Sequence, residues 1–185
     1  MRFKKEGRRN KKVLFYGLDG SGKTYSAVKY CETNGLKPVL IDIEDTCFED
    51  VPIVEIDDKN PRLLTKGICD AIKEVGESNE YDTIILDGIS TLLEDLVSNA
   101  PGMKAYKDRS DSFGQILRAI RQNDVNIIFI GQADMKVIVS EEYSSNKPII
   151  KLNAMVNEKY KCENKDGKFE VITEKMRKWF QWKEC

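Results

Sequence analysis

The stretch from Val13 to Ala27, VLFYGLDGSGKTYSA, constrains the fold of this chain more than any other. It joins a short apolar run to a glycine-rich turn and then to a segment of helical character. Gly17, Gly22, Lys23 and Thr24 fit the spacing G-x-x-x-x-G-K-[ST]. This order predicts a buried strand, a phosphate-binding loop and a helix whose N-terminus faces the phosphate.

Each residue type in this loop has a physical reason. Glycines let the backbone turn tightly and bring its amide groups close to a phosphate. We expect Lys23 to reach the β- and γ-phosphates of a bound triphosphate and the Thr24 hydroxyl to ligate Mg²⁺. The predicted binding segment consists of Gly17, Leu18, Asp19, Gly20, Ser21, Gly22, Lys23, Thr24 and Tyr25.

The other apolar runs predict an α/β fold with a mostly parallel sheet. VLFY, PVLI, TIIL and NIIFI are continuously apolar, which is typical of strands buried on both faces. The segments between them have helical length. We expect one helix to end at Asn34-Gly35 and another to begin at Pro61 after Asn60. Two more are predicted, one closing at Pro101-Gly102 and one capped by Ser110 or Asp111.

The last third of the chain has a different pattern. Residues 136–143, 147–164 and 167–182 alternate more between polar and apolar, and Asp166-Gly167 is a strong hairpin signal. We therefore expect antiparallel strands that extend the sheet at one edge. The predicted organisation is a basic arm over residues 1–11 followed by a single domain over residues 12–185, with a possible short strand at VPIVEI, residues 51–56.

Composition excludes several functional classes. The 185 residues, 33% of them charged, fit one soluble domain, and the chain has neither a membrane-length apolar run nor a signal peptide, so we expect a cytoplasmic protein. There is no histidine, which rules out catalytic triads that need imidazole and metal sites that need a histidine ligand. The five cysteines are widely spaced, which argues against zinc and favours reduced thiols. Net charge is −1, yet the first twelve residues are strongly basic; a solvated tail and a nucleic-acid contact both explain them.

Polar residues at the ends of later strands complete the expected phosphate site. Asp87 ends YDTIILD and is predicted to hold Mg²⁺ through a water, whereas Asp82 starts that strand and is expected at the surface. Glu44, after PVLID, is the predicted base that orients water; a solvated loop or a further Mg²⁺ contact are alternatives. Gln132, after NIIFIG, is predicted to sense the γ-phosphate, unless it is a polar strand end without a role.

Together GLDGSGKT, VLIDIED, YDTIILDGISTL and IIFIGQAD resemble the RecA-like ATPase core, with its Walker A and Walker B motifs, over roughly residues 12–134. The resemblance implies ATP and Mg²⁺ as cofactors, Glu44 as the catalytic glutamate, and Gln132 as the residue that couples nucleotide to DNA-binding loops. The short length and the tail look most like the compact phage and archaeal-virus ATP-binding proteins associated with single-strand annealing and recombination. A viral protein of that kind would work in the host cytoplasm.

The resemblance also implies partners. The segment SNAPGMKAYKDRSDS stands in the place of a DNA-binding loop, and its Lys104, Tyr106, Lys107 and Arg109 suit single-stranded DNA; a mobile surface loop is the alternative. Sites of this type often lie between subunits of a ring or short filament. Lys175 and Arg177 are then candidates to reach a neighbour's γ-phosphate, although a surface basic turn explains them as well.

Four functions remain open on these grounds. The first is an Mg²⁺-dependent ATPase coupled to single-stranded DNA in recombination, repair or replication. The second is a nucleotide kinase, with Arg109, Arg118 and Arg121 as a lid, although the antiparallel tail fits a kinase poorly. The third is a viral packaging motor, and the fourth a nucleotide-gated binding module. A guanine-specific N/T-K-x-D motif is absent, which favours ATP over GTP.

Overall fold

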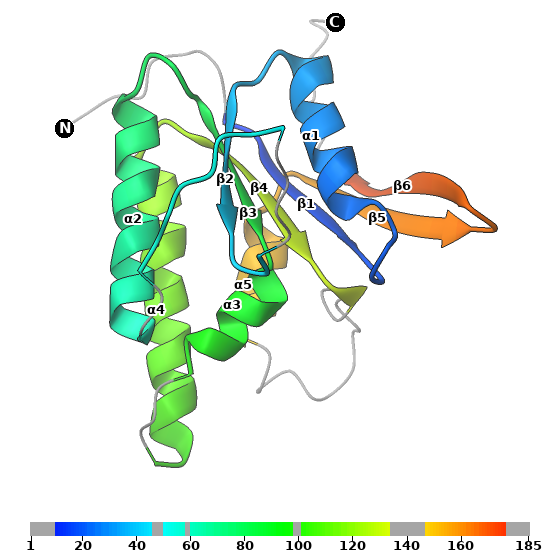
Figure 1. Cartoon of the computed structure of the whole chain (residues 1–185). Coiled ribbons are helices and arrows are strands. Elements are labelled where there is room, and N and C mark those ends of the chain that lie inside the picture. Colours follow the sequence, from blue (N-terminus) through cyan, green and yellow to red (C-terminus); the bar gives the residue numbers. More distant parts are fainter. Residues whose placement is uncertain (1–9, 46–49, 58–59, 98–100, 134–146, 177–185) are drawn as a thin grey trace, which may run out of the picture.

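The computed structural model describes residues 10–45, 50–57, 60–97, 101–133 and 147–176. A six-stranded sheet in the order β2-β3-β4-β1-β5-β6 forms the centre of this part of the chain (Figure 1). The strands are β1 (Lys12–Gly17), β2 (Pro38–Asp42), β3 (Thr83–Asp87), β4 (Asn126–Gly131), β5 (Glu158–Lys165) and β6 (Lys168–Met176). All pairs are parallel except β5 with β6. The predicted mostly parallel sheet with a C-terminal antiparallel extension is confirmed, and β5 itself runs parallel to β1.

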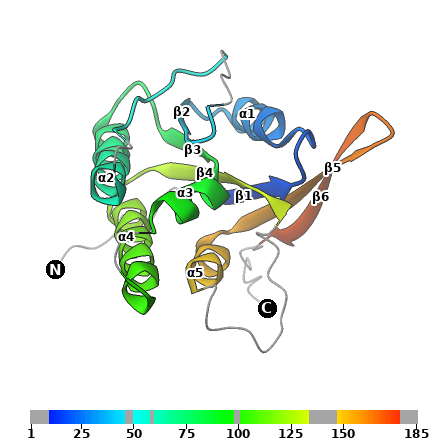
Figure 2. The same cartoon turned by 60° about the horizontal axis from the view of Figure 1, so that its bottom comes forward.

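Helices cover both faces of the sheet. They are α1 (Lys23–Asn34), α2 (Pro61–Glu77), α3 (Ile89–Asp95), α4 (Met103–Gln122) and α5 (Lys147–Met155). Figure 2 shows α1 on one side of the sheet and α3, α4 and α5 on the other. Phe15 and Ile128 pack in the cluster of α1, whereas Leu14 and Phe129 pack with residues of α2 to α5. Alternate residues of β1 and β4 are thus buried on opposite faces, which explains their continuously apolar sequences.

Several predicted ends are confirmed. Helix α1 ends at Asn34, and Gly35 adopts the left-handed conformation with φ 63°. Helix α2 begins at Pro61, and the Asn60 side chain accepts hydrogen bonds from the next two free backbone amides. In the β5–β6 turn Asp166 and Gly167 have φ values of 52° and 79°, as a two-residue hairpin requires. The local turn chemistry was therefore readable from sequence.

Two predicted helix ends are wrong. Helix α3 ends at Asp95 instead of continuing to Pro101-Gly102. Helix α4 begins at Met103, with Gly102 as its N-cap, rather than at Ser110 or Asp111. Its buried stripe already includes Ala105, so packing against the rest of the molecule begins five residues before Ser110, the predicted cap. The expected loop over residues 103–109 is consequently the first part of a helix.

The predicted strand over residues 147–164 is also partly wrong. Its first half is helix α5, and the strand begins only at Glu158. Pro148, Leu152 and Met155 are buried at helical spacing. The apolar residues of this segment therefore recur with a period near 3.6 residues, rather than with the strand-like alternation that was predicted. Residues 136–143 lie outside the described residues. The stretch 51–56 forms a single bridge, Ile53 to Leu40 of β2, in place of a strand.

No helix in the described ranges is long and apolar enough to cross a membrane.

Candidate functional site

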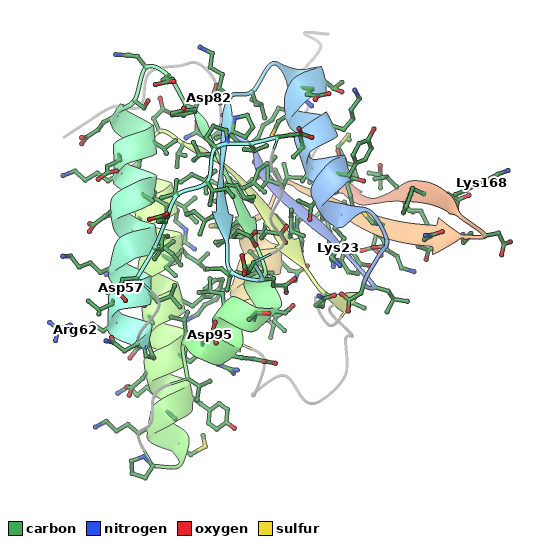
Figure 3. All side chains as sticks on the ribbon, in the orientation of Figure 1. Lys23, Asp57, Arg62, Asp82, Asp95 and Lys168 are labelled. Carbon is green, nitrogen blue, oxygen red and sulfur yellow. The ribbon has the colours of Figure 1, made fainter. Side chains whose placement is uncertain are left out.

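The carboxyl ends of the parallel strands bring the predicted polar residues to one edge of the sheet. Strand β1 leads directly into the glycine-rich loop, and the pairing of β2 with β3 sets Asp42 opposite Asp87. Gln132 follows the end of β4, the strand between β3 and β1. Figure 3 shows Lys23 at the start of α1, near this edge, and Asp82 at the other end of the sheet. Asp82 thus lies away from the site, and it is half-buried rather than fully at the surface as predicted.

Glycines set the shape of the loop. Gly20 and Gly22 have φ values of 68° and 77°, which side chains rarely tolerate. A Cβ atom on Gly17 would lie 2.3 Å from the carbonyl oxygen of Cys162 in β5. The first glycine of the motif therefore permits close packing against the neighbouring strand, while the other two permit the turn.

The Lys23 side chain lies against the loop it follows. Only 9% of the residue is exposed. Its Nζ donates hydrogen bonds to the carbonyl of Leu18 at 3.1 Å and to Oε1 of Gln132 at 3.3 Å, and lies 3.7 Å from Oδ1 of Asp19. Two residues predicted to meet a γ-phosphate, Lys23 and Gln132, are thus in contact with each other.

Thr24 and Asp87 form the closest polar contact of the site. Thr24 Oγ1 donates a hydrogen bond of 2.6 Å to Oδ2 of Asp87. Burial raises the pKa of the Asp87 carboxyl to about 6; nearby Glu44 and Asp42 also raise it, while the Thr24 hydrogen bond and Lys23 oppose the shift. Burial first, and the neighbouring carboxylates second, thus disfavour the ionised form of Asp87, which a bound cation would stabilise.

Glu44 lies two residues beyond the end of β2, so strand geometry does not orient it. Its Oε1 accepts a hydrogen bond of 3.0 Å from the hydroxyl of Thr91 in α3. The neighbouring Ser90 hydroxyl accepts a hydrogen bond of 3.0 Å from the backbone amide of Gln132. Neither hydroxyl was among the residues predicted from the sequence. Their position in the first turn after Asp87-Gly88 was the available signal.

The β5–β6 hairpin forms one wall beside the loop, a contact that was not predicted from the sequence. The Phe169 ring lies on Gly22, since a Cβ atom there would be 3.0 Å from the ring. Asn164 Nδ2 lies 3.5 Å from the carbonyl oxygen of Gly20. The Ser21 hydroxyl is buried without a hydrogen-bond partner. A pocket of about 500 Å³ adjoins the loop; it is lined by Tyr16, Gly17, Leu18, Asp19, Ser21, Ala133, Lys161, Cys162, Glu163, Asn164 and Lys165.

The predicted DNA-contacting residues lie on the N-terminal part of α4. Lys104, Tyr106 and Lys107 are exposed there, and the Arg109 guanidinium lies 5.3 Å from the centre of the Tyr106 ring. In Figure 1 this end of α4 extends beyond the sheet, away from α1. The structure therefore groups these side chains with one another but not with the glycine-rich loop.

Lys175 is engaged within its own chain. Its Nζ donates a hydrogen bond of 2.6 Å to the carbonyl of Asn153 in α5. In the sheet it lies opposite Lys159, which in turn lies opposite Leu14, three residues before Gly17. It does not reach the loop of the same chain. Arg177 lies outside the described residues.

The donor atoms of the site suit a magnesium–nucleotide complex. Mg²⁺ is usually held by one or two carboxylates plus phosphate oxygens rather than by an all-protein cage. The converging Thr24 hydroxyl and Asp87 carboxylate supply such oxygens. Within the described ranges no cluster of three or more His, Cys, Asp or Glu residues could hold a metal ion. Lys23 and the glycine-rich loop add a cation and close backbone approach for phosphates.

Comparison with known proteins agrees with this geometry. The sequence signature of the family described as AAA domain matches residues 9–165. No curated protein matches the chain.

Proposed function

Because the chain belongs to the AAA-domain family of P-loop ATPases, we propose that it is an Mg²⁺-dependent ATPase with a RecA-like core that acts on single-stranded DNA. The observation that carries this proposal is the 2.6 Å contact between Thr24 and Asp87, with the Lys23 amine beside the loop. The sheet order supports it, because β4 separates the loop strand β1 from β3, the strand that ends in Asp87.

We propose that the triphosphate lies on the loop amides and the N-terminus of α1. Lys23 Nζ then exchanges its contact with the Leu18 carbonyl for phosphate oxygens. The Thr24 hydroxyl and Asp87 would hold Mg²⁺, which neutralises the charge that develops on the phosphates. Such a cation would stabilise ionised Asp87, which is buried near other carboxylates.

Glu44 is the proposed residue that orients and deprotonates the attacking water. It is close enough to Asp87 to influence its pKa, so its carboxylate is in the neighbourhood of the proposed γ-phosphate. Gln132, which accepts from Lys23 Nζ at 3.3 Å, is the proposed sensor of that phosphate. Binding of phosphate at Lys23 would break this hydrogen bond, and the freed Gln132 amide is the proposed signal that nucleotide is bound.

The nucleoside is proposed to extend toward the β5–β6 hairpin. Asp42, Glu44 and Asp87 lie on the opposite side of the loop. These carboxylates suit a cation bound to the γ-phosphate, but they do not suit an apolar base. On the hairpin side, Phe169 presents a ring 61% exposed, and the 500 Å³ pocket is lined in part by apolar side chains. An aromatic ring beside a planar base contributes stacking.

For single-stranded DNA we propose the exposed cations and ring of α4. Lys104 and Lys107 are three residues apart on a helix and so share a face, with Tyr106 beside them. Cations that follow a phosphate backbone and a ring that stacks on a base suit single strands of any sequence. In a ring or short filament, Lys175 or Arg177 of a neighbouring copy are the proposed cations for the γ-phosphate. Recombination of the kind found in compact viral ATPases is the proposed setting.

The experiment is ATP turnover with Mg²⁺, in the presence and absence of single-stranded DNA. The wild type should hydrolyse ATP and Lys23→Ala should not. Lys29→Ala should behave as wild type, because Lys29 is an exposed lysine six residues further along the same helix. Absence of turnover in both conditions would refute the ATPase. Turnover that DNA leaves unchanged would refute the coupling to DNA alone.

A further inference from the structure

We propose that Thr91 is a positioning residue that orients the carboxylate of Glu44 for attack by water. The inference rests on the proposed function, since it concerns a residue that acts through Glu44. Glu44 itself lies in no helix or strand that would hold its side chain. Strand β2 ends at Asp42, and Asp45 has the unusual φ of 51°. A carboxylate on such a segment needs contacts from elsewhere to keep one direction.

Helix α3 and the glycine that precedes it supply two such contacts. The Thr91 hydroxyl donates to Glu44 Oε1 at 3.0 Å. The Glu44 side chain also packs over Gly88, where a Cβ atom would lie 2.7 Å from its Cγ. The hydrogen bond from Thr91 orients the carboxyl group, and the packing over Gly88 fixes the position of the Glu44 Cγ atom.

The helix that makes these contacts is itself fixed relative to the phosphate site. Ile89 and Leu92 are fully buried and anchor α3 to the core. The backbone before it is tied on both sides: Ile43 donates to the carbonyl of Asp87 at 3.1 Å, and Gly88 donates to the carbonyl of Ile130 at 3.2 Å. Through its hydrogen bond, Thr91 therefore fixes the position of Glu44 relative to Asp87, the residue proposed to hold Mg²⁺.

The hydrogen bond from Thr91 also makes the two oxygens of the Glu44 carboxylate inequivalent. Because Oε1 already accepts from Thr91, we expect Oε2 to be the oxygen that receives the water proton. A carboxylate that rotates freely would present this oxygen in the productive direction only part of the time. Misplacement of a reacting group by about 1 Å can cost about 100-fold in rate, so the loss of this hydrogen bond should be visible in kcat.

The test compares Thr91→Val and Thr91→Ser in the full chain with Mg²⁺ and ATP. Valine keeps the branched shape without the hydroxyl, so we expect kcat to fall about 10- to 100-fold with KM changed less than about twofold. Serine keeps the donor and should retain most of the wild-type kcat. Thr65→Val is the matched control, because Thr65 is a buried helical threonine whose hydroxyl donates to Pro61 in α2.

A double-variant cycle with Glu44→Gln separates positioning from a merely structural role. If Thr91 acts through Glu44, adding Thr91→Val to Glu44→Gln should lower kcat no further. An equal loss in both backgrounds would overturn the inference, as would wild-type kcat in Thr91→Val. If Glu44→Gln itself leaves kcat unchanged, it is the proposed role of Glu44 that fails. Binding of a fluorescent ATP analogue and thermal unfolding of each variant show whether the site and the fold persist.

Discussion

Thr24 Oγ1 lies 2.6 Å from Oδ2 of Asp87, although 63 positions separate the two residues in the sequence. The contact joins the first turn of α1 to the end of β3. It exists because β4 pairs with β1 on one side and β3 on the other, which sets the ends of all three strands at one edge. The Thr24 hydroxyl and the Asp87 carboxylate are thereby close enough to bind the same ligand.

Asp87 should make the stability of the ligand-free protein depend on pH. Its pKa is raised by burial to about 6, above that of an unfolded aspartate, so the folded state binds this proton more tightly. This contribution to stability is full below about pH 4 and is lost as pH rises through 6. At about 1.4 kcal/mol per unit of pKa, the loss amounts to about 3 kcal/mol. Asp87→Asn should therefore be more stable than wild type at pH 8, by urea unfolding in EDTA, and the gap should narrow toward pH 5.

Addition of Mg²⁺ and ATP provides the control for this experiment. Wild type should then gain more stability than Asp87→Asn, which lacks the charge that holds the cation. A stability difference between the two proteins that is the same at pH 5 and pH 8 would contradict the shifted pKa of Asp87.

Gly88→Ala should damage both stability and turnover. Gly88 has φ 89°, and a Cβ atom would lie 2.7 Å from Cγ of Glu44. Gly35→Ala is the matched control, because Gly35 is also left-handed, with φ 63°, but has no atom within 4 Å of a built Cβ. We expect Gly35→Ala to lower the free energy of unfolding by about 1 kcal/mol without altering kcat. Gly88→Ala should cost more and lower kcat about tenfold; equal behaviour of the two variants would rule out the contact with Glu44.

Phe169→Ala should weaken ATP binding more than it weakens the fold. The ring contacts Gly22 of the loop from the β5–β6 hairpin and is 61% exposed. Loss of one stacking interaction, about 1 kcal/mol, corresponds to a roughly fivefold higher Kd in a fluorescent-nucleotide titration. Val171→Ala, on the same face of β6 and opposite Cys162, should leave the Kd unchanged. If Phe169→Ala also binds with wild-type affinity, the nucleoside does not lie against the hairpin.

Replacement of Lys104 and Lys107 by alanine should weaken binding of single-stranded DNA. Each lost phosphate contact lowers the slope of log K against log salt by about 0.7, so the double variant should lose about 1.4. Basal ATP turnover should be unchanged, because these residues lie on α4 away from the loop. The double variant Lys66→Ala and Lys73→Ala, which removes exposed lysines from α2, controls for net charge. Equal DNA affinity of the two double variants would exclude the α4 surface.

Much of the proposed site was readable from sequence because its signals are local. A glycine-rich turn needs positive φ at Gly20 and Gly22, and the residues that bind phosphate follow directly. The ends of α1 and α2 and the β5–β6 hairpin depend on caps and turns of a few residues. The strands that are buried on both faces could also be predicted from a local signal, because such burial requires an unbroken apolar run.

The predictions that failed depended on tertiary packing. The start of α4 and the helical state of α5 follow from which face of each segment is buried, and the short apolar patterns of both segments fit more than one periodicity. The contacts of Thr91 with Glu44 and of Phe169 with Gly22 join residues that are 47 and 147 positions apart. Sequence by itself determined the loop, the strand ends and the chemistry that they offer. Only the order of strands in the sheet decided which side chains meet there, because contacts between distant residues follow from topology rather than from local conformation.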